Sequence, residues 1–169
     1  NNLWLCTMNG VSKFLKKPFI IYSNISKDII DVVVDNENNI WMGTYGDLIK
    51  YNQEKGLTRY TNLIKERTVT ALYLDNDNLW VGTNFGLLLF KNDNLFTVRK
   101  DFFVYNICKD YKGNLWIAHD KGISKYNGKK FLNYTKENGL STDECYTIAV
   151  DKNNKVWIGT TFGLNILDD

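Results

Sequence analysis

The sequence predicts an all-β protein made of β-propeller blades, each a four-stranded antiparallel meander, and three observations support this. Five tryptophans recur at intervals of 37, 39, 36 and 41 residues, each in a short apolar phrase of the type Asn-Leu-Trp-Ile-Gly-Thr. The chain holds one proline and shows no long run of helical periodicity. Repeats of about 40 residues built from short strands are typical of propeller blades. The tryptophans are Trp4, Trp41, Trp80, Trp116 and Trp157.

The third repeat shows how one blade is expected to form. Its apolar runs alternate with turns rich in Asn, Asp and Gly, which tolerate left-handed dihedrals and bond their own backbone. Strands are expected over residues 69–74, 79–83, 87–91 and 95–99. Together these strands make one meander of about 31 residues. The other repeats show the same order of apolar runs and turns.

Two further positions recur in these repeats. An aspartate closes the first strand, and we expect its carboxylate to accept backbone N–H groups of the hairpin turn. A glycine marks the turn after the tryptophan strand. The run 75–78 weakly resembles a calcium loop but lacks the central glycine and the distal glutamate, so turn chemistry is favoured. The aspartates are Asp35, Asp75, Asp110 and Asp151, and the glycines are Gly46, Gly86, Gly122 and Gly163.

Longer links join one meander to the next and divide a single propeller region, 1–169, into five blade repeats. The first repeat starts at a second strand and the last ends at a third strand, so three full meanders lie between two partial ones. This pattern fits a segment of a larger propeller or a small five-bladed ring. It also predicts association with further blades or with a second copy, because unpaired strand edges seek partners. The repeats cover about 1–28, 29–67, 68–103, 104–143 and 144–169.

Composition narrows the classes of partner. The formal charge is +2, and the 21 basic and 19 acidic residues are interleaved, so nucleic acid is not expected as a partner. No apolar run approaches the roughly 20 residues that span a bilayer, which argues against membrane insertion of this segment. The three cysteines are scattered without CxxC spacing, and we expect them to be small core residues.

The repeated phrase resembles the two-component regulator propeller repeat. The best copies run from Asp110 to Tyr126, with Gly139-Leu140-Ser141, and from Asp151 to Leu164. The resemblance implies seven-bladed propellers, usually two in tandem, that form the extracytoplasmic sensor region of membrane histidine kinases, often ones that sense glycans. Cys6 and Ala118 depart from it, because they replace the motif glycine. The resemblance also implies a periplasmic or extracellular location.

Each tryptophan is expected to be structural. On the second strand of a blade it would wedge between neighbouring sheets, with its indole N–H bonded to a carbonyl. A sugar-stacking role for these five rings is the less favoured alternative.

Residues that differ between equivalent repeats are the candidates for recognition, because a repeat scaffold varies its loop tips. In a propeller, the turn after each tryptophan strand lies near the central funnel. Three aromatic residues and three polar residues of these turns are therefore predicted to bind a ligand, unless the rings cover a neighbouring blade. His119 stands where other repeats carry threonine, and an imidazole could replace that hydroxyl in the turn. The six residues are Tyr45, Phe85, Phe162, His119, Asp120 and Lys121.

These observations predict a sensor region that binds a ligand without catalysis. A single histidine and scattered cysteines supply neither a metal site nor an acyl-transfer set, and no cofactor is expected. A histidine kinase activity would lie outside this segment. The ligand class, an oligosaccharide or a similar small molecule, follows from the resemblance alone. A propeller for protein–protein interaction is the first alternative, and a propeller lyase or hydrolase the second.

Overall fold

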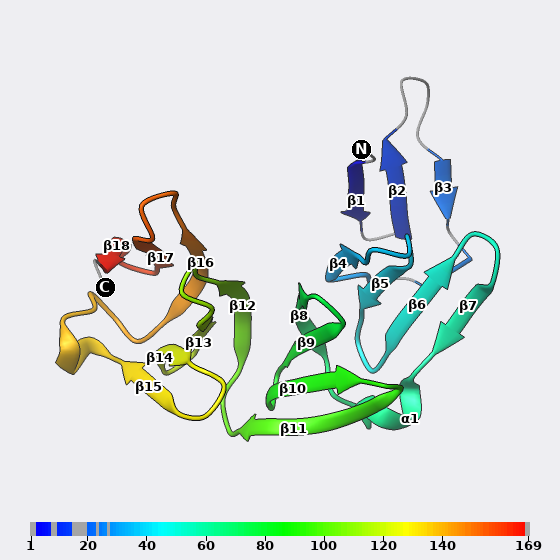
Figure 1. Cartoon of the computed structure of the whole chain (residues 1–169). Helices are drawn as coiled ribbons and strands as arrows, with labels where there is room; N and C mark the ends of the chain where they lie inside the picture. Colours follow the sequence, from blue (N-terminus) through cyan, green and yellow to red (C-terminus); the bar gives the residue numbers. More distant parts are fainter. Residues whose placement is uncertain (1–2, 8–9, 15–19, 23, 27, 168–169) are drawn as a thin grey trace. The chain divides into compact units, whose positions relative to one another are not determined.

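Antiparallel strands are the main secondary structure of the computed structural model, with only short helical segments between them (Figure 1). The structure describes residues 3–7, 10–14, 20–22, 24–26 and 28–167. None of the helices in these ranges has the length and apolar character needed to cross a membrane. The strands form sheets of three or four members, and in every sheet consecutive strands are neighbours. The predicted all-β class and the meander topology are therefore confirmed.

The first two sheets begin the chain. The first contains β1 (Leu3–Thr7), β2 (Gly10–Phe14) and β3 (Ile20–Tyr22). The second contains β4 (Asp31–Val34), β5 (Ile40–Gly43), β6 (Leu48–Asn52) and β7 (Gly56–Arg59). The short helix α1 (Thr61–Ile64) follows β7 within a link that the sequence left as a loop.

The remaining sheets repeat this plan. The third contains β8 (Val69–Asp75), β9 (Asn78–Thr83), β10 (Gly86–Lys91) and β11 (Asn94–Lys100). The fourth contains β12 (Val104–Lys109), β13 (Leu115–His119), β14 (Gly122–Tyr126) and β15 (Phe131–Tyr134). A 3-10 turn, η1 (Lys136–Asn138), leads to the fifth, which contains β16 (Cys145–Val150), β17 (Val156–Thr160) and β18 (Gly163–Leu167).

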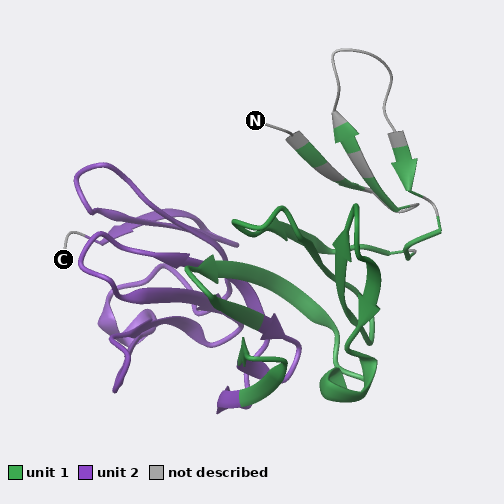
Figure 2. Cartoon of the chain, turned by 45° about the vertical axis from the view of Figure 1, so that its right-hand side comes forward, with its two compact units in different colours: residues 1–81, 89–96 green, residues 82–88, 97–169 purple. Residues whose placement is uncertain are grey.

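The chain divides into two units, which are described separately (Figure 2). Unit 1 comprises residues 1–81 and 89–96, and unit 2 comprises residues 82–88 and 97–169. The third sheet contributes strands to both units. The core of unit 1 is an apolar cluster that includes Met42 and Ile49, and the core of unit 2 is a cluster around Trp116 and Ile158.

A bond between an aspartate and a tryptophan closes the first hairpin of three repeats. In the second repeat, Asp35 Oδ1 accepts from the backbone N–H of Asn39 at 2.8 Å, and Asp35 Oδ2 accepts from the indole Nε1–H of Trp41 at 2.9 Å. The turn bonds predicted for this aspartate are therefore present. The predicted carbonyl partner of the indole is wrong, because a carboxylate six residues earlier takes that place. The same indole bond joins Trp116 to Asp110 and Trp157 to Asp151, each at 2.9 Å.

The third repeat has a tighter hairpin. Asp75 lies within β8, five residues before Trp80 rather than six, and only Asn76 and Asp77 separate β8 from β9. Asn76 adopts a φ of 54°. A two-residue hairpin needs positive φ angles, and Asn tolerates them better than most residues. The bond between the aspartate and the indole six residues later is thus found in the repeats whose first hairpin has the longer turn.

The tryptophans of the full sheets are buried, and each of two is covered on its own blade by a tyrosine and a lysine. Trp41 stacks on Tyr60 with ring centroids 5.7 Å apart, and Lys50 Nζ lies 5.0 Å from the Trp41 ring. Trp116 stacks on Tyr134 at 5.8 Å. Tyr134 ends the fourth strand of its sheet and Tyr60 directly follows the fourth strand of its own, so the indole is both a core residue and a contact between parts of one repeat.

The glycine position also needs a correction in the second repeat. A Cβ at Gly86 would overlap the Arg99 carbonyl oxygen, so the glycine that begins the third strand allows the fourth strand to approach. In the third repeat, the Thr83 hydroxyl donates to the Gly86 carbonyl. In the second repeat, the Thr44 hydroxyl donates to the carbonyl of Asp47. Asp47, and not Gly46, therefore occupies the equivalent position.

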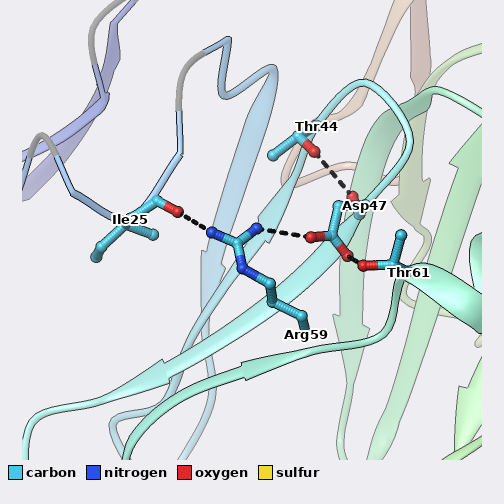
Figure 3. A network of polar contacts seen from close by, with 5 residues as sticks. All are labelled: Ile25, Thr44, Asp47, Arg59 and Thr61. Atoms are coloured by element: carbon cyan, nitrogen blue, oxygen red, sulfur yellow. Dashed lines mark hydrogen bonds and ion pairs between the residues drawn. The ribbon is translucent and has the colours of Figure 1, made fainter.

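The Asp47 carboxylate uses this position to hold three segments of unit 1 together (Figure 3). Its Oδ2 accepts from Arg59 Nη1 at 2.7 Å and its Oδ1 accepts from the Thr61 hydroxyl at 2.9 Å. Arg59 Nη2 donates to the carbonyl of Ile25, which precedes β4. A buried carboxylate and a guanidinium thus fix β7, α1 and the segment before β4 to the start of β6.

Candidate ligand-binding face

The turns after the tryptophan strands and the links between sheets are joined by hydrogen bonds in unit 2. Asp101 N donates to the Phe85 carbonyl at 3.3 Å, and Phe103 N donates to Asp120 Oδ1 at 2.8 Å. Farther along, Gly122 N donates to the carbonyl of residue 143 at 2.6 Å, and residue 161 N donates to the carbonyl of residue 144 at 3.3 Å. We call this surface, formed by residues 84–85, 101–103, 120–121, 143–144 and 161–162, the loop face of unit 2.

Two of the predicted aromatic residues are exposed on the loop face. Phe85 is 61% exposed and Phe162 is 78% exposed. Asp120 and Lys121 are exposed in the turn between β13 and β14, and the Lys121 ammonium donates to the carbonyl of Asp101. Phe85, Phe162, Asp120 and Lys121 therefore belong to one surface, although their predicted contact with a ligand is a separate question.

Tyr45 lies in unit 1, in the turn after β5. Its side chain is 69% exposed, and its backbone forms a bridge with Thr68. Its ring is available to solvent as predicted for a loop tip, but it belongs to the other unit and is not counted in the loop face of unit 2.

His119 is in the core rather than on the surface, with 2% of its area exposed. Its Nδ1 accepts from the backbone N–H of Lys121 at 3.2 Å, as the Thr83 hydroxyl accepts from Phe85 N at 3.1 Å. The imidazole therefore replaces the threonine in the turn, which was the structural interpretation of the substitution. Because Nδ1 is an acceptor, the neutral ring carries its proton on Nε2, which lies 2.8 Å from Ser124 Oγ.

The His119–Ser124 pair has the residue types of a nucleophile and a base but not their arrangement. The proton sits on the nitrogen that faces the serine, so the imidazole cannot accept the hydroxyl proton. Burial, and next the Arg99 charge, lower the pKa of His119 from 6.5 to about 4. Ser124 is also buried, so a substrate has no access to its hydroxyl. The geometry makes this pair part of the fold.

The thiols of Cys108 and Cys145 are the other potentially reactive groups in the core of unit 2. Burial raises the pKa of Cys108 to about 12 and that of Cys145 to about 11, so both thiols stay protonated near neutral pH. Within the described ranges of the chain, no three His, Cys, Asp or Glu side chains gather as metal ligands do.

An aromatic cluster that the sequence analysis missed adjoins the loop face. Phe103 and Tyr105 have ring centroids 4.6 Å apart, and Tyr105 meets Tyr146 edge-on at 4.8 Å. Tyr105 belongs to β12 and Tyr146 to β16, the first strands of neighbouring sheets. Asn106 Oδ1 links these strands by accepting from Ile148 N at 3.3 Å. We call Phe103, Tyr105 and Tyr146 the aromatic cluster.

The aromatic cluster combines ring surface with polar groups. Tyr146 is 46% exposed. Burial first, and then the nearby Tyr146, Asp120 and Glu144, raise the pKa of Tyr105. Two carboxylates therefore lie close to the rings, and both are exposed. A signal was present in the sequence, because Tyr105 and Tyr146 are each the second residue of the first strand of their repeat. Aromatic rings beside carboxylates offer both an apolar platform and hydrogen-bond acceptors.

Comparison with known proteins agrees with this architecture. The model of the family described as two-component regulator propeller matches residues 63–85, 101–121 and 139–162. Each match covers a hairpin of the first two strands of a sheet, together with the link that precedes it. The protein is thus of the β-propeller class. Three of its segments match the two-component regulator propeller repeat, the family that the sequence resembles.

A curated relative is a histidine kinase of Formosa agariphila, 27% identical over 162 residues. The alignment covers 80% of this chain and 12% of the relative. This chain therefore corresponds to a small part of that much longer relative.

Solved structures confirm the fold. The extracellular domain of a putative one-component system from B. thetaiotaomicron matches 98% of this chain and 25% of its own, with 19% identity and a TM-score of 0.86. The extracellular domain of a putative hybrid two-component system from the same organism matches 99% and 25%, with 22% identity and a TM-score of 0.81. Virginiamycin B lyase from Staphylococcus aureus matches 99% and 66%, with 11% identity and a TM-score of 0.76.

Proposed function

We propose that this chain is part of an extracytoplasmic sensor region that binds a small ligand, of the oligosaccharide class, at the loop face of unit 2 and does not transform it. The observation that carries the proposal is the aromatic cluster beside Asp120 and Glu144. The repeats and the similarity to extracellular domains of signalling proteins support the sensor role. The ligand class rests on the chemistry of the cluster and on the family resemblance.

The physical argument for a sugar starts from the two kinds of surface that a pyranose presents. Its ring carbons form an apolar face that packs on aromatic side chains, and its hydroxyl groups need acceptors at the rim. Tyr146 offers an exposed ring, while Asp120 and Glu144 offer carboxylate oxygens. No described residue makes a hydrogen bond to the phenol oxygen of Tyr105 or Tyr146, so both hydroxyls remain available to a ligand.

The experiment is a calorimetric screen of neutral oligosaccharides against the whole chain, followed by Tyr146→Ala. Loss of one stacking ring should weaken binding about threefold to tenfold. Tyr111→Ala is the matched control, because Tyr111 is also an exposed tyrosine but lies in the hairpin between β12 and β13, at the other end of the strands. Equal losses in the two variants, or no binding by any glycan in the screen, would overturn the proposal. Chemical alteration of a bound glycan would refute its non-catalytic part.

Signalling then follows from a difference in affinity. A ligand shifts an equilibrium between two arrangements of a receptor only if it binds one of them better. We propose that occupation of the loop face favours one arrangement of the full receptor. Limited proteolysis of a longer receptor with and without ligand would test this step, and identical digestion patterns would contradict it.

An interaction surface is a second candidate function, and one observation favours it. Leu164 and Ile166 are exposed along β18, which is one of the two edge strands of its sheet among the described residues. Apolar residues on an open strand edge favour pairing with another chain. Sedimentation at increasing concentration tests self-association, and Leu164→Asp should abolish any rise in mass. A monomer at every concentration would argue against association with a second copy.

A further inference from the structure

We infer that a second site in unit 2, a pocket of about 340 Å³ around Arg99, binds an oxyanion group of a ligand, either a carboxylate or a sulfate or phosphate ester. The pocket is formed by the end of β11, the end of β15 and the turn between β13 and β14. It shares no side chain with the aromatic cluster. The inference does not depend on the proposed sugar site.

Arg99 is held rigidly in this pocket. Its Nη1 donates to Asn133 Oδ1 at 2.7 Å and to Ser124 Oγ at 3.1 Å. Its guanidinium carbon lies 4.8 Å from the ring centroid of Phe131 and 5.2 Å from that of Phe102. Two hydrogen bonds and two aromatic faces fix the guanidinium, so little conformational entropy would be lost when it binds a ligand.

The charge of Arg99 has no carboxylate partner in the described part of the chain. Burial lowers the pKa of Arg99, and no neighbouring anion offsets that effect. Both hydrogen bonds use Nη1, so the Nε and Nη2 groups donate to no residue that the structure describes. A guanidinium edge with free N–H groups matches the two oxygens of a carboxylate, sulfate or phosphate.

Other groups add to the positive potential of the pocket. Lys100 and Lys121 also line it, and the Lys121 ammonium is positioned by the Asp101 carbonyl. Asp101 is the only acidic residue among the lining residues within the described part of the chain. Two further carboxylates lie near the wall, and each already accepts a backbone N–H: Asp120 from Phe103, and Asp143 from Lys136.

His119 forms part of the wall and serves as a reporter. Burial first, and then the positive charges of Arg99 and Lys121, lower the pKa of His119, so the ring is neutral near pH 7. It orients Ser124, which in turn contacts Arg99. As the single histidine of the chain, it gives one unambiguous ring signal in an NMR spectrum. An anion bound beside Arg99 would change the electrostatic field at that ring.

The test titrates the whole chain with sodium acetate, sodium sulfate and sodium phosphate at constant ionic strength set with sodium chloride. We expect a saturable shift of the His119 ring signal with an oxyanion and none when chloride replaces it. A response to acetate alone would identify a carboxylate ligand, and a response to sulfate or phosphate would identify an ester. Linear drift without saturation for all three salts would overturn the inference.

Variants separate this site from the fold and from the sugar site. Lys121→Gln should weaken oxyanion binding about threefold to tenfold, whereas Lys129→Gln, the same charge change in the exposed hairpin after β14, should leave it unchanged. Arg99→Gln should abolish it. Tyr146→Ala should leave the titration unaffected, so failure of either site is distinguishable from failure of the other. Equal affinity of Lys121→Gln, Arg99→Gln and the native chain would refute the inference.

Discussion

Arg59 and Arg99 occupy the ends of fourth strands in successive sheets, yet their surroundings differ. Arg59, on β7, lies 2.7 Å from the Asp47 carboxylate and also donates to a backbone carbonyl. Among the described residues, the guanidinium of Arg99, on β11, donates hydrogen bonds only to a serine hydroxyl and an amide oxygen. The carboxylate exists because Asp47 replaces the glycine found at this position in neighbouring repeats. In the third repeat, a side chain at this position would block the approach of the fourth strand. In the second repeat, the side chain at this position is the counter-ion of Arg59. One arginine is therefore a structural element, and the other is free for recognition.

The largest expected effect is a dependence of the free energy of unfolding on pH, and it arises from His119, which lies beside Arg99. The folded state lowers the pKa of His119 from 6.5 to about 4, so the unfolded chain takes up the proton first as the pH falls. The free energy of unfolding is therefore at its highest above about pH 6.5, where the ring is neutral in both states, and it falls as the pH falls toward 4. The loss amounts to about 3 kcal/mol. Urea unfolding across this range measures it.

His119→Thr provides the control, since threonine is the residue of the equivalent repeats and can accept the same backbone N–H. This variant should show a flatter dependence of the unfolding free energy between pH 6.5 and 4. If the native chain and the variant lose stability equally, the imidazole is not the titrating group.

The two arginines should respond differently to the same substitution. Arg59→Gln removes the charged partner of buried Asp47, and we expect the free energy of unfolding to fall by about 2 kcal/mol, a value reduced because Arg59 is half exposed. Arg99→Gln leaves no carboxylate without a charged partner, and the new amide can still donate to Asn133. The expected fall in the free energy of unfolding is therefore below about 1 kcal/mol. Urea unfolding followed by circular dichroism compares them. Equal losses would remove the distinction between a structural and a free arginine.

A double-mutant cycle isolates the smallest effect. Asp47→Ala and Arg59→Gln together should cost less than the sum of the single variants, with a coupling of about 1 kcal/mol. Asp77→Ala combined with Arg59→Gln is the matched control, because Asp77 is exposed in the turn between β8 and β9 and should show no coupling. Additive losses for Asp47 and Arg59 would mean that the ion pair contributes nothing.

The spacing of the tryptophans was sufficient to predict the repeats. The strands within each repeat could be predicted from local alternation and turn residues. The position of Gly46 was predicted wrongly, since its glycine follows Trp41 by five residues and not six, and sequence alone did not show which backbone position faces the fourth strand. The acceptor of the indole was missed for a related reason. A spacing of six residues brings a carboxylate to Trp41 only once the turn has folded.

The candidate site was less predictable. Exposure of Phe85 and Phe162 at loop tips followed from their place in the turns. The aromatic cluster depends on the distance between β12 and β16, which are about 40 residues apart in the chain. The Arg99 pocket depends on what Arg99 lacks as well as on what it contacts. Such non-local relations leave no mark in a short motif.

The bond between aspartate and tryptophan has a consequence for how such chains arise. Because the carboxylate and the indole it holds are six residues apart, each of these three hairpins contains both partners of the bond that closes it. A gene segment that encodes one repeat can therefore be duplicated, lost or exchanged without separating the two partners. Repeats that keep this bond can therefore differ at their loop tips without losing the closure of the hairpin.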